Sequence, residues 1–196
     1  MTKTAISQGG MRDLFIDSGA LLEGHFQLSS GLHSTQYMQC ALLLAHPDQA
    51  EKLGRALAGL QKTKPDLILS PAMGGLIIGQ EVARALGVRH YFTERQEGVM
   101  TLRRGFTLKP GEKIAVVEDV VTTGKSSKEA MDLARGYGVE ITGWMSIVNR
   151  SGSDLVLDVP LQSLLKTAIP SFRPEDCPPC KAGKPVVKPG SRPKPQ

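Results

Sequence analysis

The sequence has few cysteines, no long apolar run and no strong excess of charge. Its three cysteines, Cys40, Cys177 and Cys180, are too few and too unevenly placed for a disulfide framework, which indicates a reducing compartment. Apolar stretches such as 67–69 and 114–117 are far too short to cross a bilayer. The N-terminus also lacks the basic stretch and apolar core of a signal peptide. We therefore expect a cytoplasmic protein with no membrane partner.

The net charge of +5 is concentrated at the C-terminus, because residues 174–196 hold five basic and two acidic side chains. The rest of the chain is close to +2, so charge alone does not call for a nucleic-acid partner, although it suits a phosphorylated small ligand. The same segment contains seven of the 13 prolines. We interpret 174–196 as a Pro/Lys-rich surface tail and 1–173 as one domain with its own core.

Apolar strands alternate with amphipathic helices through most of the chain. A first helix is expected from Met11 to an end at Asp17, Ser18 and Gly19. Further helices are expected at 48–60, 76–86 and 126–137, and strands at 25–28, 35–39, 67–70, 88–92, 113–117 and 140–148. Strands rich in Val, Ile and Leu between such helices predict an α/β fold with a parallel sheet flanked by helices on both faces. Ligands of such sheets bind beyond the carboxyl ends of the strands.

Residues 93–112 follow neither the helix nor the strand pattern. An irregular stretch of this length inside a compact domain is usually a functional flap or a misread element. Gly98, Gly105, Gly111 and the arginines of the segment favour a mobile loop for an anionic ligand, with a short hairpin inside it as an option.

The segment 114–127 carries the clearest chemical signal. A buried strand ends in Glu118 and Asp119, and the small turn Thr122-Thr123-Gly124 then opens a helix. Backbone N–H groups at the helix start, with the neighbouring hydroxyls, can surround a phosphate. The two carboxylates upstream are placed to accept hydrogen bonds from the hydroxyls of a ribose whose 5′-phosphate fills the turn.

Two other interpretations of this segment are weaker. Gly124-Lys125-Ser126 matches the end of the nucleotide-triphosphate loop pattern, but Asp119 stands where that pattern needs its first glycine and would repel a triphosphate. An ordinary capped helix after a buried strand explains the turn. It leaves the two carboxylates near a core unexplained, because unpaired buried charges are costly.

The segment resembles the ribose-phosphate-binding signature of the type I phosphoribosyltransferases. The resemblance implies a Mg²⁺-dependent pentosyl transfer from 5-phosphoribosyl 1-pyrophosphate to a ring nitrogen, with Mg²⁺ carried mainly by the substrate pyrophosphate rather than by direct protein ligands. A second loop, at 70–75, follows a strand and corresponds to the family's pyrophosphate loop. The residues expected to bind the donor are Glu118, Asp119, Val120, Val121, Thr122, Thr123, Gly124, Lys125, Ser126, Ala72, Met73, Gly74, Gly75, Arg95, Arg103 and Arg104.

Residues 21–39 resemble the N-terminal hood of the orotate phosphoribosyltransferases, and the similarity extends over about 10–172. It implies a hood at about 10–40, orotate contacts from Thr122 and Arg150, and synthesis of orotidine 5′-phosphate in pyrimidine biosynthesis. From position alone, Arg150 would be an ordinary solvated arginine. Ser29 replaces a lysine found in many members, and the loop at 93–112 lacks their histidine, which suggests a divergent bacterial subgroup with a short catalytic loop.

The resemblance also implies how the reaction proceeds. Glu118 and Asp119 would orient the ribose and stabilise its developing cation, and Arg95 is the loop arginine that best matches the family position for pyrophosphate stabilisation. The loop would reach the neighbouring subunit, which implies a homodimer. No covalent nucleophile is needed, so Cys40 is expected to be a buried apolar residue.

Several alternatives stay open at this stage. A purine or uracil phosphoribosyltransferase would share the segment 118–126, and a regulator of the same fold could sense the donor, although no helix-turn-helix is apparent. The pair Cys177 and Cys180 has C-x-x-C spacing without a second pair nearby. A surface cysteine pair is the expected reading, with a zinc site shared across a dimer as the alternative.

Overall fold

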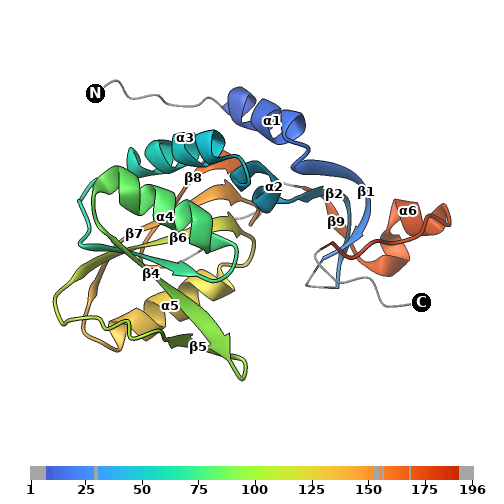
Figure 1. Ribbon diagram of the computed structural model, residues 1–196. Helices are drawn as coiled ribbons and strands as arrows, with labels where there is room; N and C mark the ends of the chain where they lie inside the picture. The colour runs from blue at the N-terminus through green and yellow to red at the C-terminus, as the bar shows by residue number, and fades with distance from the viewer. Residues whose placement is uncertain (1–7, 29–30, 152–154, 156, 168, 190–196) are drawn as a thin grey trace.

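The computed structural model describes residues 8–28, 31–151, 155, 157–167 and 169–189 (Figure 1). They form helices flanking a six-stranded sheet, with a smaller three-stranded sheet beside it. In chain order the elements are α1 (Gln8–Asp17), β1 (Leu21–Gln27), β2 (His33–Met38), α2 (Cys40–Leu44), α3 (Pro47–Ala58), β3 (Leu67–Pro71), α4 (Gly75–Leu86), β4 (Arg89–Gln96), β5 (Val99–Leu102), β6 (Lys113–Val121), α5 (Lys125–Arg135), β7 (Glu140–Asn149), β8 (Leu161–Lys166), β9 (Ser171–Phe172), the 3-10 helix η1 (Pro174–Asp176) and α6 (Pro178–Lys181).

The larger sheet has the strand order β5-β4-β3-β6-β7-β8. All of its neighbouring strands pair in parallel except β4 and β5, which form an antiparallel hairpin. Helices α3 and α4 cover one face and α5 covers the other (Figure 1). The prediction of a parallel sheet flanked by helices is therefore confirmed.

Alternation along the central strands divides the core between these two faces. On β3, Ile68 packs in the cluster that contains α3 and α4 residues, whereas Leu67 and Leu69 pack in the cluster under α5. On β6, Val117 and Val116 divide in the same way. Successive side chains of a strand point to opposite faces, so a strand buried on both faces is apolar throughout.

The segment 93–112 is more regular than its sequence suggested. Residues up to Gln96 continue β4, and β5 returns antiparallel to it, which is the short hairpin considered as an option. Phe106 stacks on Tyr91 with ring centroids 4.2 Å apart, and Leu108 is buried in the core under α5. The hairpin considered as an option is therefore present at 93–102, while 103–112 has neither helix nor strand and packs on the core through Phe106 and Leu108.

The smaller sheet, which we call the hood sheet, has the order β1-β2-β9 and is antiparallel. Its first two strands were expected from the sequence, and its third comes from residues 171–172. The C-terminal segment then folds back as η1 and α6 beside this sheet (Figure 1). Ser29, the position of the missing hood lysine, lies outside the described residues. None of the helices within the described ranges is long and apolar enough to span a bilayer.

Candidate functional site

The carboxyl end of β6 and the loop after β3 meet closely at the edge of the sheet. A Cβ atom placed on Gly74 would lie 2.4 Å from Oδ1 of Asp119, and one on Gly75 would lie 2.9 Å from the carbonyl oxygen of Val117. The peptide bond between Ala72 and Met73 is cis, and the Ala72 N–H donates to the carbonyl of Thr93. Two segments that the sequence selected separately, 70–75 and 114–127, thus form one site.

Glu118 is fixed by a chain of buried hydrogen bonds. The Ser127 hydroxyl donates to Oε2 of Glu118 at 2.6 Å, and the Trp144 indole N–H donates to the same hydroxyl at 2.8 Å. The Glu118 side chain is only 8% exposed, and burial raises its pKa from 4.5 to about 7, although Ser127 opposes this shift. Ser127 and Trp144 were not selected from the sequence, since neither carries a family signature.

Asp119 lies next to Glu118 but is partly exposed. Burial raises the pKa of its carboxyl, while hydrogen bonds from backbone N–H groups oppose that effect. None of the ion pairs formed by the described residues includes either carboxylate. Two acids without a basic partner, Asp119 partly exposed and Glu118 buried behind it, suit a ligand that brings hydroxyl groups and a divalent cation.

The turn from Val121 to α5 leaves its polar groups open. Thr122 and Thr123 are exposed, and Gly124 begins the helix in the left-handed conformation with φ of 70°. Gly124 offers no side-chain cap, and the Lys125 N–H donates only a long hydrogen bond of 3.4 Å to the Thr123 hydroxyl, so an anion bound at the start of α5 could replace that acceptor. A side chain at this glycine would also crowd the Trp144 ring, whose nearest atom lies 3.1 Å from the Cβ position.

Arg150 enters the site from the end of β7. Its backbone N–H donates to the carbonyl of Val121, which places it beside the turn. Its side chain is partly buried, burial lowers its pKa, and its buried Nε has no hydrogen-bond partner among the described residues. A buried guanidinium N–H without an acceptor is costly, so this group is suited to an anionic ligand.

Tyr37 and Cys40 of the hood segment lie near Arg150. Burial, together with the charge of Asp119, raises the pKa of both groups, and the nearby charge of Arg150 opposes that shift. Cys40 is 1% exposed and its pKa is well above the ordinary value, which confirms its expected buried, unreactive state. Tyr37 was missed as a site residue because more than a hundred residues separate it from Arg150, and only the hood resemblance pointed to that region.

The loop arginines are held by carboxylates of the same chain. Arg95 donates to the Gly98 carbonyl and forms an ion pair with Glu129 of α5. Arg104 has φ of 63° and binds both oxygens of Glu94 at 2.8 and 2.9 Å. Arg103 is exposed. The three arginines therefore lie on or directly after the β4–β5 hairpin, and Arg95 reaches α5 at Glu129, which also pairs with Lys125 of the turn 122–126.

Comparisons with known proteins agree with this geometry. The model of the phosphoribosyl transferase domain matches residues 41–160, more than half of the chain. The chain is 53% identical over 182 residues to a protein of Carboxydothermus hydrogenoformans named orotate phosphoribosyltransferase, covering 91% of this chain and 95% of that protein. It is 51% identical over 183 residues to the Thermotoga maritima protein of the same name, covering 93% and 98%.

Solved structures show the same fold. Orotate phosphoribosyltransferase from Aeropyrum pernix has a TM-score of 0.69 at 24% identity, covering 80% of this chain and 93% of that one. Adenine phosphoribosyltransferase from Thermoanaerobacter pseudethanolicus has a TM-score of 0.61 at 17% identity, covering 67% and 88%. The solved structures show which fold this chain has, and the sequence relatives show which family it belongs to. The chain belongs to the phosphoribosyltransferase family, and within it to the orotate phosphoribosyltransferase group.

Proposed function

We propose that this chain transfers ribose 5-phosphate from 5-phosphoribosyl 1-pyrophosphate to orotate, giving orotidine 5′-phosphate and pyrophosphate for pyrimidine synthesis. The observation that carries the choice of orotate is the buried, unpartnered Nε of Arg150 beside the donor-binding turn. Orotate presents a carboxylate, and an arginine N–H beside a carboxylate makes a charge-assisted hydrogen bond. Thr122, exposed on the same turn, is the second proposed orotate contact.

The turn 120–126 is proposed to bind the 5′-phosphate through its backbone N–H groups and hydroxyls. Asp119 accepts hydrogen bonds from the ribose hydroxyls, and Glu118, held by Ser127, supplies negative charge behind it. As the bond from the sugar to pyrophosphate breaks, pyrophosphate departs with the electron pair, positive charge develops on the ribose, and these carboxylates stabilise it. A ring nitrogen of orotate bonds to the same carbon and loses its proton to the departing pyrophosphate or to water.

The loop 72–75 is proposed to bind the pyrophosphate through its backbone. Its glycines lie against Asp119 and Val117 with no room for a side chain, so the main chain is the surface that a ligand meets. Mg²⁺, bound to the donor, supplies charge neutralisation of the leaving group. The uncompensated Asp119 fits a role in receiving this cation-bearing substrate.

The remaining parts of the proposal concern the loop and the assembly. Arg95, with Arg103 and Arg104, stabilises the pyrophosphate when the segment 93–112 closes over a neighbouring subunit of a homodimer. Closure excludes water, which would otherwise capture the ribosyl cation. We also propose a cytoplasmic location, which the three free cysteines support because thiols persist in a reducing compartment.

A substrate panel tests the acceptor. The protein is incubated with Mg²⁺, the pyrophosphate donor and orotate, uracil, adenine or hypoxanthine in turn, and pyrophosphate release is measured. We expect release with orotate alone. Release with uracil or a purine but not with orotate would overturn the proposal and favour the other transferases of this fold.

Replacing Arg150 tests the observation that carries the proposal. Arg150→Ala removes a charge-assisted contact worth about 1.5–3 kcal/mol, so we expect kcat/KM for orotate to fall roughly 10- to 150-fold. The KM for the donor should change much less. Arg55→Ala, which removes an exposed arginine of α3, is the matched control and should behave as the wild type. An unchanged kcat/KM for orotate in Arg150→Ala would contradict the assignment.

A further inference from the structure

Four side chains with metal-binding atoms converge where the C-terminal segment crosses the hood sheet. They are His25 on β1, His33 on β2, and Cys177 and Cys180 of the η1–α6 segment. One ligand atom from each lies within 4.8 Å of all the others. The expectation of a surface cysteine pair is wrong for Cys177, which is 0% exposed, and two of the distant histidines complete the set in space.

Four of the six separations between these atoms are close to the edges of a tetrahedron around zinc, and the other two are within 4.8 Å. Cys180 Sγ lies 3.2 Å from His33 Nδ1 and 3.5 Å from His25 Nε2, and Cys177 Sγ lies 3.4 Å from His25 Nε2. The two nitrogens are 2.9 Å apart. Zinc bond lengths of about 2.0–2.3 Å imply edges of roughly 3.3 Å between nitrogens and 3.6 Å between nitrogen and sulfur. Shifts of a few tenths of an ångström would fit the ion.

Hydrogen bonds alone leave several of these groups competing for one acceptor. Nδ1 of His25 lies 2.9 Å from the carbonyl oxygen of Lys184, which can only accept, so Nδ1 carries the proton of the neutral ring. Nε2 then has one lone pair facing His33, Cys177 and Cys180 together. A cation at the centre takes one lone pair from each of the four atoms. The Lys184 carbonyl would act as the outer hydrogen-bond partner that fixes a ligating imidazole.

We propose that His25 Nε2, His33 Nδ1, Cys177 Sγ and Cys180 Sγ bind one zinc ion, which fastens the C-terminal segment to the hood sheet. Four protein ligands of the Cys₂His₂ type close the coordination sphere, so the ion is structural rather than catalytic. The site lies within one chain. It therefore differs from a site shared across a dimer and from the Mg²⁺ that accompanies the donor.

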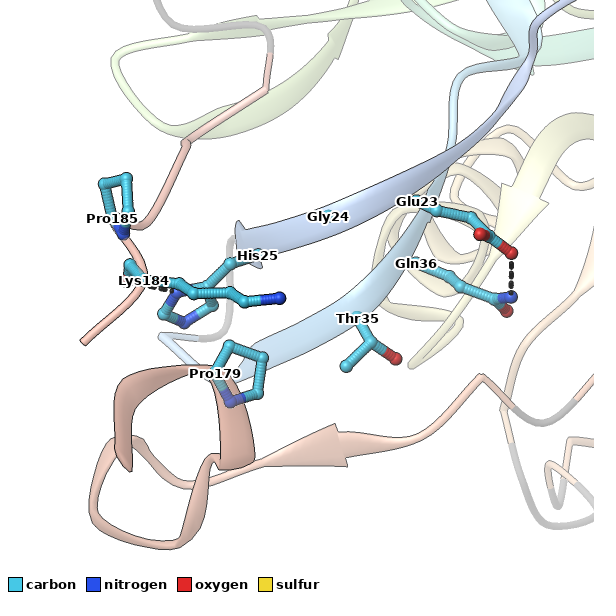
Figure 2. A pocket seen from close by; sticks show the side chains of 8 residues that line it. All are labelled: Glu23, Gly24, His25, Thr35, Gln36, Pro179, Lys184 and Pro185. Carbon is cyan, nitrogen blue, oxygen red and sulfur yellow. Dashed lines mark hydrogen bonds between the residues drawn. The ribbon is translucent and has the colours of Figure 1, made fainter. Parts of the chain in front are cut away.

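Contacts around the cluster show what the ion would hold together. The Gln27 N–H donates to the Val187 carbonyl, and the Val187 N–H donates to the His25 carbonyl, both at 2.8 Å. Figure 2 shows His25 between the hood strands and the chain at Lys184, with Pro179 of α6 on the other side. The residues drawn there line a hollow with a volume of about 500 Å³, which is bounded by the hood and this segment, so its shape depends on how the segment is fastened.

Zinc content is the direct measurement. The reduced full-length protein is equilibrated with zinc, desalted, and analysed for metal by mass spectrometry, and we expect about one ion per chain. Substitution by Co²⁺ should give the visible absorption of tetrahedral thiolate coordination. Cys177→Ser with Cys180→Ser should abolish both signals, whereas Cys40→Ala and His46→Gln, the matched cysteine and histidine controls, should keep the metal.

A second measurement uses the wild type alone, in case the double variant folds poorly. Removing zinc with a chelator should speed tryptic cleavage after Lys181, which lies at the end of α6, and re-addition of zinc should reverse the effect. Absence of zinc uptake by reduced wild-type protein would overturn the proposal. So would full zinc content in the double variant, or a disulfide between Cys177 and Cys180 under reducing conditions. Activity with orotate is assayed separately, so a failure of the zinc proposal can be distinguished from a failure of the proposed function.

Discussion

Gly74 illustrates how single residues define this site, because the main chain at that position touches the carboxylate of Asp119. A Cβ there would fall 2.4 Å from Oδ1, and its next neighbours are atoms of the same carboxylate. The loop and the acid therefore hold each other in place. The sequence selected both residues, but their contact follows only from the packing of β3 against β6.

We expect Gly74→Ala to displace Asp119 and to lower kcat/KM for the donor by about tenfold or more, since a misplacement of about 1 Å costs up to a hundredfold in rate. Steady-state kinetics with the donor as varied substrate measure this effect. Gly9→Ala is the control, because a Cβ at Gly9 meets nothing within 4 Å. Wild-type kinetics in Gly74→Ala would show that the contact does not position the acid.

Glu118 makes the stability of the protein dependent on pH. Its folded-state pKa is raised to about 7 from 4.5, so the folded protein holds a proton that the unfolded chain releases. Its stabilising contribution is complete below about 4.5 and is lost as pH rises through about 7. Glu118→Gln removes this dependence.

We compare the free energy of unfolding of Glu118→Gln with that of the wild type at each pH. From about pH 4 to about pH 8, this difference should shift in favour of the variant by up to about 3 kcal/mol. Urea unfolding at both pH values measures the difference. Glu140→Gln, at an exposed position, is the control and should follow the wild type at both. A constant difference between Glu118→Gln and wild type would contradict the raised pKa.

At the scale of secondary-structure elements, the β4–β5 hairpin is tied to α5 through Arg95 and Glu129. The proposed role of Arg95 in binding pyrophosphate requires this ion pair to open. Exposed pairs contribute about 0.2–1 kcal/mol, so Glu129 competes only weakly with a doubly charged ligand. The Arg95–Glu129 pair thus holds the hairpin against α5 in the absence of substrate, and we expect substrate binding to break this pair.

Glu129→Gln should lower the KM for the donor by up to about fivefold, because the competing carboxylate is gone. Arg95→Ala should instead lower kcat. Initial rates over a range of donor concentrations separate the two effects. Glu51→Gln, which breaks a comparable arginine pair between α3 and α4, is the control. A higher KM in Glu129→Gln would mean that this ion pair orients Arg95 for catalysis.

The sequence predicted most elements because helix and strand periodicities are local. It located β3, β6 and β7 to within a few residues and selected 114–127 as the donor site. It did not predict β8 or α2, whose short apolar runs carry no clear period. Contacts between distant segments, such as Tyr37 near Arg150 or His25 beside Cys177, depend on tertiary packing that no spacing in one sequence encodes.

At the scale of the whole molecule, the proposed homodimer with exchanged loops makes a prediction about mixtures. If Arg95 acts on the neighbouring site, a dimer of one Arg95→Ala chain and one Asp119→Asn chain has one intact site. Two inactive proteins, mixed under conditions that exchange subunits, should then recover up to about a quarter of wild-type activity, since half of the dimers are mixed.

Coexpression of the two variants with different affinity tags, followed by purification of the mixed dimer, sharpens this measurement. Each variant alone is the control and should remain nearly inactive. Failure of the mixed dimer to regain activity would show that Arg95 serves its own chain. Sedimentation of the wild type should also give twice the chain mass of 21.1 kDa.

The hood sheet is assembled from segments that precede and follow the central sheet in the chain, and this affects how the protein is made. Its strands β1 and β2 are synthesised before the central sheet, but β9, Cys177, Cys180 and Val187 are synthesised after it. The last strand of the central sheet ends at Lys166, so this sheet can fold during translation before β9 and the η1–α6 segment have been synthesised. A premature stop after residue 170 would leave every residue of the donor site in the chain, but the hood sheet would lack β9 and its contacts with the C-terminal segment.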